Sequence, residues 1–148
     1  MVGVKVKSKK PPRRSASLYP RVVPLSLHGA LAEAGLSGDM ADVPVEEAPL
    51  WFRRFWAADV AAVTLPWAVY LSPEAYPSIV AGTDPRLIAH EAEHVAQWRR
   101  LGVFRFAAQY LADYGRGRLS GLPHDVAYRA IRLEREAEEK AWQAIKER

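Results

Sequence analysis

The 148-residue chain contains no cysteine. Disulfide bridges are therefore excluded, and so are the thiolate ligands of zinc fingers and related structural sites. Any transition metal that the chain holds must be bound by histidine and carboxylate side chains. Asparagine is also absent and glutamine is scarce. This bias is typical of thermophiles, although a GC-rich genome produces it as well.

The chain also lacks a long apolar run. No segment is long enough to cross a bilayer, and no secretory hydrophobic segment follows the first residues. The longest candidate, Trp56 to Leu71, is interrupted by Asp59 and Pro66. We therefore expect a cytoplasmic protein without a membrane partner. At this length, one domain with a single core is the simplest organisation.

Acidic residues are absent from the first 21 positions, which carry seven lysines and arginines. The rest of the chain has 14 basic and 17 acidic residues, so a basic arm precedes a mildly acidic body. We assign residues 1–20 to a disordered arm and residues 21–148 to one domain. The arm is interpreted first as a solvated tail. Contact with nucleic acid or an acidic surface, and folding back over the body, are the alternatives.

Hydrophobic periodicity and turn residues predict a mostly helical α+β domain. The first half of the chain is expected to contain a short helix over Leu27 to Ala34 and a loop over Gly38 to Pro49. An amphipathic helix is expected over Leu50 to Asp59. Val60 to Leu65 and Ala68 to Leu71 then predict a two-stranded hairpin or ribbon.

Three longer helices are expected in the second half of the chain. The first covers Pro85 to Leu101, because Asp84 or Thr83 can cap its start and Gly102 follows its last residue. The second covers Phe104 to Arg116, after which glycines loosen the chain until Pro123 starts the third. The apolar face expected for the second helix comprises Phe104, Ala107, Ala108, Leu111 and Tyr114.

The first of these helices contains the pattern H-E-x-x-H, from His90 to His94. Two histidines four residues apart lie on one side of a helix, so both imidazoles can reach the same metal ion. Glu91 projects from the adjoining surface and is the candidate general base for a metal-activated water. Helical projection turns His90, Glu91 and His94 toward packed structure, and Glu93, Gln97 and Arg100 toward a polar side. A pair of core histidines satisfied by other partners is the alternative.

The last helix offers a third ligand. Its apolar stripe has Glu134 in the middle and Glu138 near the edge, whereas Glu136 points to the opposite side. A carboxylate within an apolar stripe is costly unless it is paired or binds a metal. Glu134 is therefore expected to complete the metal site, and Glu138 to orient a ligating histidine. The alternative is an ion pair of Glu134 with Arg129 or Arg132.

The stretch from His90 to Gln97, H-E-A-E-H-V-A-Q, resembles the active-site helix of zincin metallopeptidases. More closely, it is similar to small bacterial zinc-peptidase-like domains of the DUF4157 and minigluzincin type. Those domains have H-E-x-x-H-V-x-Q, then a helix, then a helix that bears a glutamate. Glu134 to Glu138 resembles their third-ligand segment, E-x-x-A-[D/E]. The likeness spans roughly Val60 to Trp142, and Glu93 departs from it because zincins usually have an uncharged residue there.

This resemblance implies a minimal zincin-like domain with a short sheet beside the active-site helix. It implies that His90, His94 and Glu134 bind Zn²⁺ and that Glu91 activates a water. Tyr128 and His124 are the candidates for stabilising the oxyanion. Against them, Tyr128 projects away from the stripe that holds Glu134, and His124 lies at a helix start.

A zinc-dependent metallopeptidase, a hydrolase acting on peptide or protein substrates, is the leading prediction. The first alternative keeps the zinc without turnover, as a metal-stabilised interaction domain. The second is a metal-free helical adaptor whose basic arm contacts nucleic acid.

Overall fold

The computed structural model describes residues 24–54 and 60–148. As expected, these residues form a mostly helical α+β fold with one small sheet. The basic arm and the last part of the helix expected over Leu50 to Asp59 lie outside the described residues. The described elements are α1 (Leu27–Glu33), β1 (Val45–Glu47), α2 (Leu50–Arg53), β2 (Ala62–Leu65), β3 (Ala68–Leu71), α3 (Tyr76–Val80), α4 (Pro85–Leu119), α5 (His124–Arg129) and α6 (Arg132–Lys146).

The sheet has the strand order β1-β3-β2. β2 and β3 form the predicted antiparallel hairpin, with Thr64 opposite Val69. β1 pairs in parallel with β3 and sets Val45 opposite Val69, so the loop predicted over Gly38 to Pro49 is wrong at these three residues. A strand this short carries no period of its own, and it exists because it pairs with the buried central strand.

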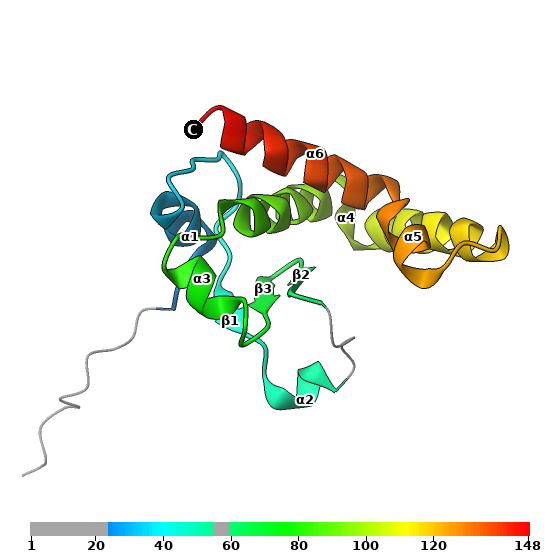
Figure 1. Cartoon of the computed structure of the whole chain (residues 1–148), viewed down its shortest axis with the longest axis horizontal. Coiled ribbons are helices and arrows are strands. Elements are labelled where there is room, and N and C mark those ends of the chain that lie inside the picture. Colours follow the sequence, from blue (N-terminus) through cyan, green and yellow to red (C-terminus); the bar gives the residue numbers. More distant parts are fainter. Residues whose placement is uncertain (1–23, 55–59) are drawn as a thin grey trace, which may run out of the picture.

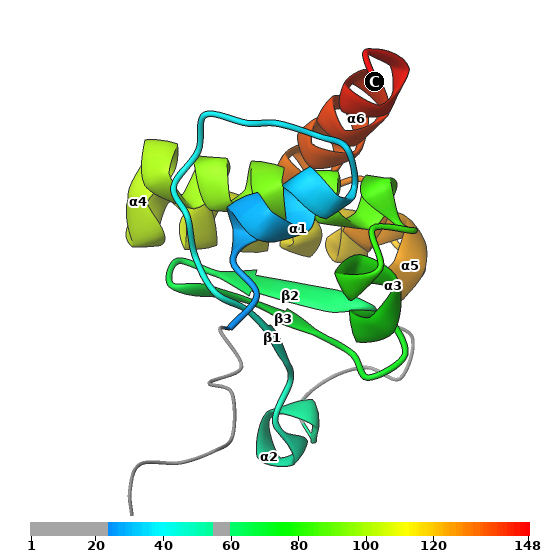
Figure 2. The same cartoon turned by 90° about the vertical axis from the view of Figure 1, so that its left-hand side faces the viewer.

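α4 is the central element of the described residues and contacts α1, α3, β2, α5 and α6. Figure 2 shows α4 lying over one face of the sheet, with α1 in front of it and α2 beyond the opposite face. Ile88 of α4 belongs to the same buried core as Leu27 of α1 and Leu71 of β3. The helix starts as predicted, because the Asp84 side chain accepts a hydrogen bond from the Leu87 N–H. Within the described residues, no helix has both the length and the apolar character needed to cross a bilayer.

A bend at Gly102 divides α4 into two halves. Gly102 has φ 73° and ψ 165°, a conformation available essentially only to glycine. The two predicted helices are therefore halves of one bent element, and the second half continues beyond the predicted end at Arg116. Gly117 lies inside this half instead of loosening it. A Cβ at Gly117 would stand 2.9 Å from the Cβ of Ala127, so the glycine allows α5 to pack closely.

The apolar face predicted for the second half of α4 is wrong except at Tyr114. Phe106 is buried there and packs with Tyr110 and Tyr114, whereas Phe104 and Leu111 are exposed. The bend at Gly102 resets the rotation of the helix, so that aromatic side chains spaced by four residues face inward. The outer face keeps several large apolar side chains.

The predicted C-terminal helix is two helices. α5 ends at Arg129, and α6 begins at Arg132 after the fully buried Ile131. Ile131 gives α6 no side-chain cap, and Asp113 of α4 supplies one instead. The Asp113 carboxylate accepts the Arg132 backbone N–H at 3.2 Å and its Nε–H at 2.8 Å. Figure 1 shows α6 lying along α4. The Asp113 contact helps to hold this arrangement, which brings Glu134 close to the histidines.

Candidate metal centre

Three side chains converge where α6 lies along α4: His90, His94 and Glu134. The Nε2 atom of His90 lies 3.1 Å from Nε2 of His94 and 3.2 Å from Oε2 of Glu134. The distance from Nε2 of His94 to the same oxygen is 3.4 Å. Ligands of a tetrahedral ion with bonds of about 2.0–2.1 Å stand about 3.3–3.4 Å apart. The structure therefore brings the three predicted ligands together, and they can hold a metal ion.

The charges around this site favour a cation. Burial alone lowers the pKa of His94, but its hydrogen bond with Glu134 and the charges of Glu91 and Glu134 raise that pKa to about 9. Burial alone raises the pKa of Glu134, but hydrogen bonds from His90 and His94 hold it well below its usual range. Two buried carboxylates thus surround one position, which is the electrostatic setting of a metal site.

Gln97 fixes the orientation of His94. Its side-chain N–H group donates to the Leu133 carbonyl at 2.9 Å, so its amide oxygen faces His94. Nδ1 of His94 lies 2.9 Å from that oxygen and is therefore the donor in this contact. Nε2 of His94 is thereby directed at His90 and Glu134. The prediction that Gln97 lies on a polar side is wrong, because this glutamine is completely buried.

Glu138 stands behind His90, as predicted from the helical projection. Its Oε2 lies 3.3 Å from Nδ1 of His90. Arg86 and the Trp142 indole both donate hydrogen bonds to the other carboxylate oxygen. The histidine and its carboxylate neighbour are therefore held in place from both helices.

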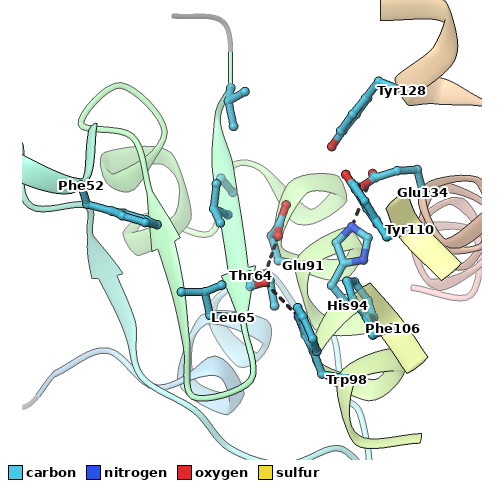
Figure 3. A pocket seen from close by; sticks show the side chains of 13 residues that line it. Phe52, Thr64, Leu65, Glu91, His94, Trp98, Phe106, Tyr110, Tyr128 and Glu134 are labelled. Carbon is cyan, nitrogen blue, oxygen red and sulfur yellow. Dashed lines mark hydrogen bonds and ion pairs between the residues drawn. The ribbon is translucent and has the colours of Figure 1, made fainter. Parts of the chain in front are cut away.

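Two tyrosines border the third ligand. The Tyr110 hydroxyl donates to Oε1 of Glu134 at 2.8 Å, which leaves Oε2 to the histidines. The Tyr128 hydroxyl points toward Tyr110 and Glu134 (Figure 3). Burial and then the Glu134 charge raise the pKa of both hydroxyls, so both are protonated donors at neutral pH. The projection that turned Tyr128 away is wrong, because the break at Ile131 separates α5 from α6.

Thr64 joins the edge strand β2 to the candidate base. Its hydroxyl donates to Oε2 of the buried Glu91 at 2.5 Å. The Trp98 indole N–H donates to the Thr64 carbonyl at 2.9 Å. Figure 3 shows Thr64 held between these two residues of α4, with the other oxygen of Glu91 turned toward the cavity. Among the described residues, only Thr64 hydrogen-bonds this carboxylate.

Two of the clefts at the site are lined by Glu91. One, of about 480 Å³, has mostly apolar walls from β2 and an aromatic wall formed by Trp98, stacked on Phe106 at 3.7 Å. The other, of about 420 Å³, is lined by charged and polar residues that include Arg86 and His124. His124 lies at the start of α5, as predicted, and hydrogen-bonds the Tyr114 hydroxyl at 2.9 Å.

The carboxylates of Glu136 and Glu93 pair with other residues of α4 instead of the candidate metal ligands. Glu136 accepts hydrogen bonds from Arg100 at 2.9 and 3.0 Å and from Gln97 at 3.1 Å. Glu93 lies 3.8 Å from Arg100. Burial, and then the Glu136 charge, raise the pKa of Glu93. The polar side predicted for Glu93 and Arg100 is therefore an ion-pair network between α4 and α6.

Sequence reasoning missed Thr64, Gln97 and Tyr110. Gln97 has a polar side chain, so the sequence suggests an exposed position, and only the packing of α6 against α4 shows that it is buried. The spacing of Phe106, Tyr110 and Tyr114 by four residues was the available signal for the inner face. Comparisons with protein-family models, curated proteins and solved structures find no match to this chain.

Proposed function

We propose that this protein is a zinc-dependent peptidase in which His90, His94 and Glu134 hold the ion. The observation that carries the proposal is the spacing of their three ligand atoms, 3.1 to 3.4 Å, beside the buried Glu91. Two histidines and one glutamate form a donor set typical of catalytic zinc. When bound, zinc supplies a Lewis acid and lowers the pKa of a water in the coordination position left open by three protein ligands.

Glu91 is proposed as the general base. The Thr64 hydroxyl holds its Oε2 atom, so the other oxygen is directed into the cavity to accept a proton. The carboxylate is buried between its own helix, α4, and β2, where the Thr64 hydroxyl bonds it. A base that is already held in the reactive geometry lowers the entropic cost of reaching the transition state.

Tyr128 is the better supported of the two candidates for stabilising the oxyanion. Its hydroxyl is a donor that points toward the site and lines the clefts on both sides of it. His124 lines only the more polar of these two clefts and shares its Nδ1 with Tyr114. A donor aimed at developing negative charge lowers the barrier of acyl transfer.

The edge of β2 supports a peptide as substrate. The Ser72 N–H donates to the Ala61 carbonyl, and hydrogen-bonded pairs alternate along an antiparallel ladder. The backbone groups of Ala62 and the Thr64 N–H therefore point away from β3, toward the cleft side, whereas the Thr64 carbonyl accepts the Trp98 indole N–H. An extended peptide can add to such an edge through its main chain. Bound there, it lies beside Glu91 and the three ligands.

Replacing Glu91 with Gln tests the proposal, with Glu93→Gln as the matched control on the same helix. Purified wild-type protein should contain one zinc ion and cleave members of a mixed peptide library. The Glu91→Gln variant should keep the zinc and lose at least about a hundredfold in kcat, whereas Glu93→Gln should keep most of the activity. Zinc content is measured by atomic emission and cleavage by mass spectrometry.

Three results would contradict this assignment in different ways. Cleavage by Glu91→Gln at the wild-type rate would show that Glu91 is not the general base. Zinc without any cleavage would support the metal-stabilised interaction domain instead. Protein that binds no zinc would exclude both and leave the metal-free adaptor.

A further inference from the structure

The outer face of the second half of α4 is apolar. Phe104 is 90% exposed, Leu111 66% and Leu119 92%. With about 100° per residue, these three side chains, together with Ala108 and Gly115, fall within about 80° of one another, along about 22 Å of helix. Tyr110, which bonds Glu134, lies on the opposite side of the helix. The exposed stripe is therefore separate from the metal centre and needs its own explanation.

Arginines border this stripe. Arg105 and Arg116 project along one side of it, and Arg118 projects along the other. The only acid between Gly102 and Pro123 is Asp113, which points inward and is bound by Arg132 and Arg116. An apolar strip with cationic margins is typical of helices that lie in the interface of an anionic membrane.

The charges disfavour a second copy as the occupant of this face. A twofold axis near Leu111 would pair two such helices in antiparallel fashion, with Phe104 against Leu119 of the partner. The same axis would place Arg105 beside Arg116 of the partner, so the contact would bring like charges together along one side of the stripe. A lipid surface offers the opposite charge in place of this repulsion, together with an apolar layer.

We infer that the second half of α4 binds the surface of an anionic lipid bilayer, independently of the proposed peptidase function. Phe104, Leu111 and Leu119 enter the boundary between headgroups and acyl chains, and Arg105 and Arg118 contact lipid phosphates. The expectation of no membrane partner considered only spanning segments, and a helix bound at the surface needs no spanning length.

Vesicle flotation with the full chain tests this inference. Wild-type protein should float with phosphatidylcholine vesicles that contain about one third phosphatidylglycerol, and should not float with phosphatidylcholine alone. A Phe104→Ser/Leu111→Ser variant should bind at least about tenfold more weakly, because two apolar anchors are lost. Arg105→Gln/Arg118→Gln should also bind more weakly. Trp67→Ser, which removes a 61% exposed side chain from the β2–β3 turn, should bind like wild type.

Circular dichroism and thermal melting verify that each variant is folded, because all the changed positions are exposed. Wild-type protein that fails to float would overturn the inference. Unchanged binding by Phe104→Ser/Leu111→Ser would also overturn it, since the basic arm alone would then account for the contact. A dimer detected by light scattering and dissociated by the same double change would assign the face to a second copy of the chain.

Discussion

Thr64 is a positioning residue in the proposed reaction. Thr64 is buried, its hydroxyl donates to Glu91, and its carbonyl accepts from Trp98. This one residue therefore orients the Glu91 carboxylate and also connects β2 to α4. A hydrogen bond to a charged group contributes about 1.5–3 kcal/mol. That contribution is enough to select one rotamer of a glutamate over its alternatives.

Thr64→Val should therefore lower kcat by about tenfold or more, because the isosteric valine cannot hold the Glu91 carboxylate. Zinc content and KM should change little, since neither the ligands nor the edge of β2 is altered. Thr64→Ser restores the hydroxyl and should recover most of the rate. Steady-state kinetics on one cleaved peptide measures both parameters. Equal rates for valine and serine variants would show that Thr64 serves only packing.

At the residue scale, the sequence alone was sufficient to predict which three side chains converge and insufficient to predict the groups that orient them. His90 and His94 follow from helical spacing, and Glu134 from the cost of an acid within an apolar stripe. Thr64 and Gln97 act through contacts between distant segments. Such contacts depend on which elements pack together, and nothing in the local sequence encodes them.

Gly102 determines the direction of the second half of α4. Its φ of 73° together with its ψ of 165° is a combination available essentially only to glycine, and a Cβ there would meet no atom within 4 Å. Gly102→Ala should therefore destabilise the protein by about 1 kcal/mol through backbone strain alone.

Gly115→Ala is the matched control, because Gly115 lies in regular helix and its Cβ would also meet no atom within 4 Å. It should stabilise the protein by about 0.4–1 kcal/mol. Urea unfolding measures both free energies. Stabilisation by both alanines would show that the bend is not required.

Asp113 links the end of α4 to the start of α6. Hydrogen bonds from Arg132 hold the pKa of Asp113 below its ordinary value. A carboxyl group with a lowered folded pKa contributes stability that is present above its unfolded pKa and is lost as the pH falls through the folded value.

Asp113→Ala should lower the free energy of unfolding by about 1–2 kcal/mol at neutral pH, as expected for loss of a helix cap. The difference from wild type should shrink as the pH falls below about 3.9. Asp39→Ala, at an exposed position, should show no such pH-dependent difference. Urea unfolding at a series of pH values provides the comparison. A constant penalty at every pH would exclude the charge as its source.

At the element scale, periodicity and caps predicted α1, the β2–β3 hairpin and the start of α4. Sequence could not predict β1, which exists only because it pairs with β3. It also placed the wrong face of α4 inward after Gly102, because the more apolar side of this segment is exposed and the side with Phe106 and Tyr110 packs inward. The break at Ile131 has no glycine or proline to mark it, and it follows from the cap that Asp113 provides.

For the whole molecule, the candidate site joins two long helices, so a bound ion should stabilise the entire fold. Free zinc at about a hundred times its Kd should raise the free energy of unfolding by about 2.7 kcal/mol, and a chelator should reverse the effect. Glu134→Gln should lose most of this zinc response, since it removes a charged ligand. Glu136→Gln, two residues away, should retain it. Thermal melting with and without zinc measures the response, and equal zinc responses in both variants would exclude Glu134 as a ligand.

The spacing of the candidate ligands along the sequence also determines the order in which they are synthesised. Glu134 lies 44 residues after His90, so at about 5–20 residues per second a ribosome adds it roughly two to nine seconds later. Until α6 has folded back onto α4, a growing chain presents only two histidines to a metal. A chain that still lacks a folded α6 is therefore expected to compete poorly for zinc, and the proposed hydrolysis begins only after α6 has packed against α4.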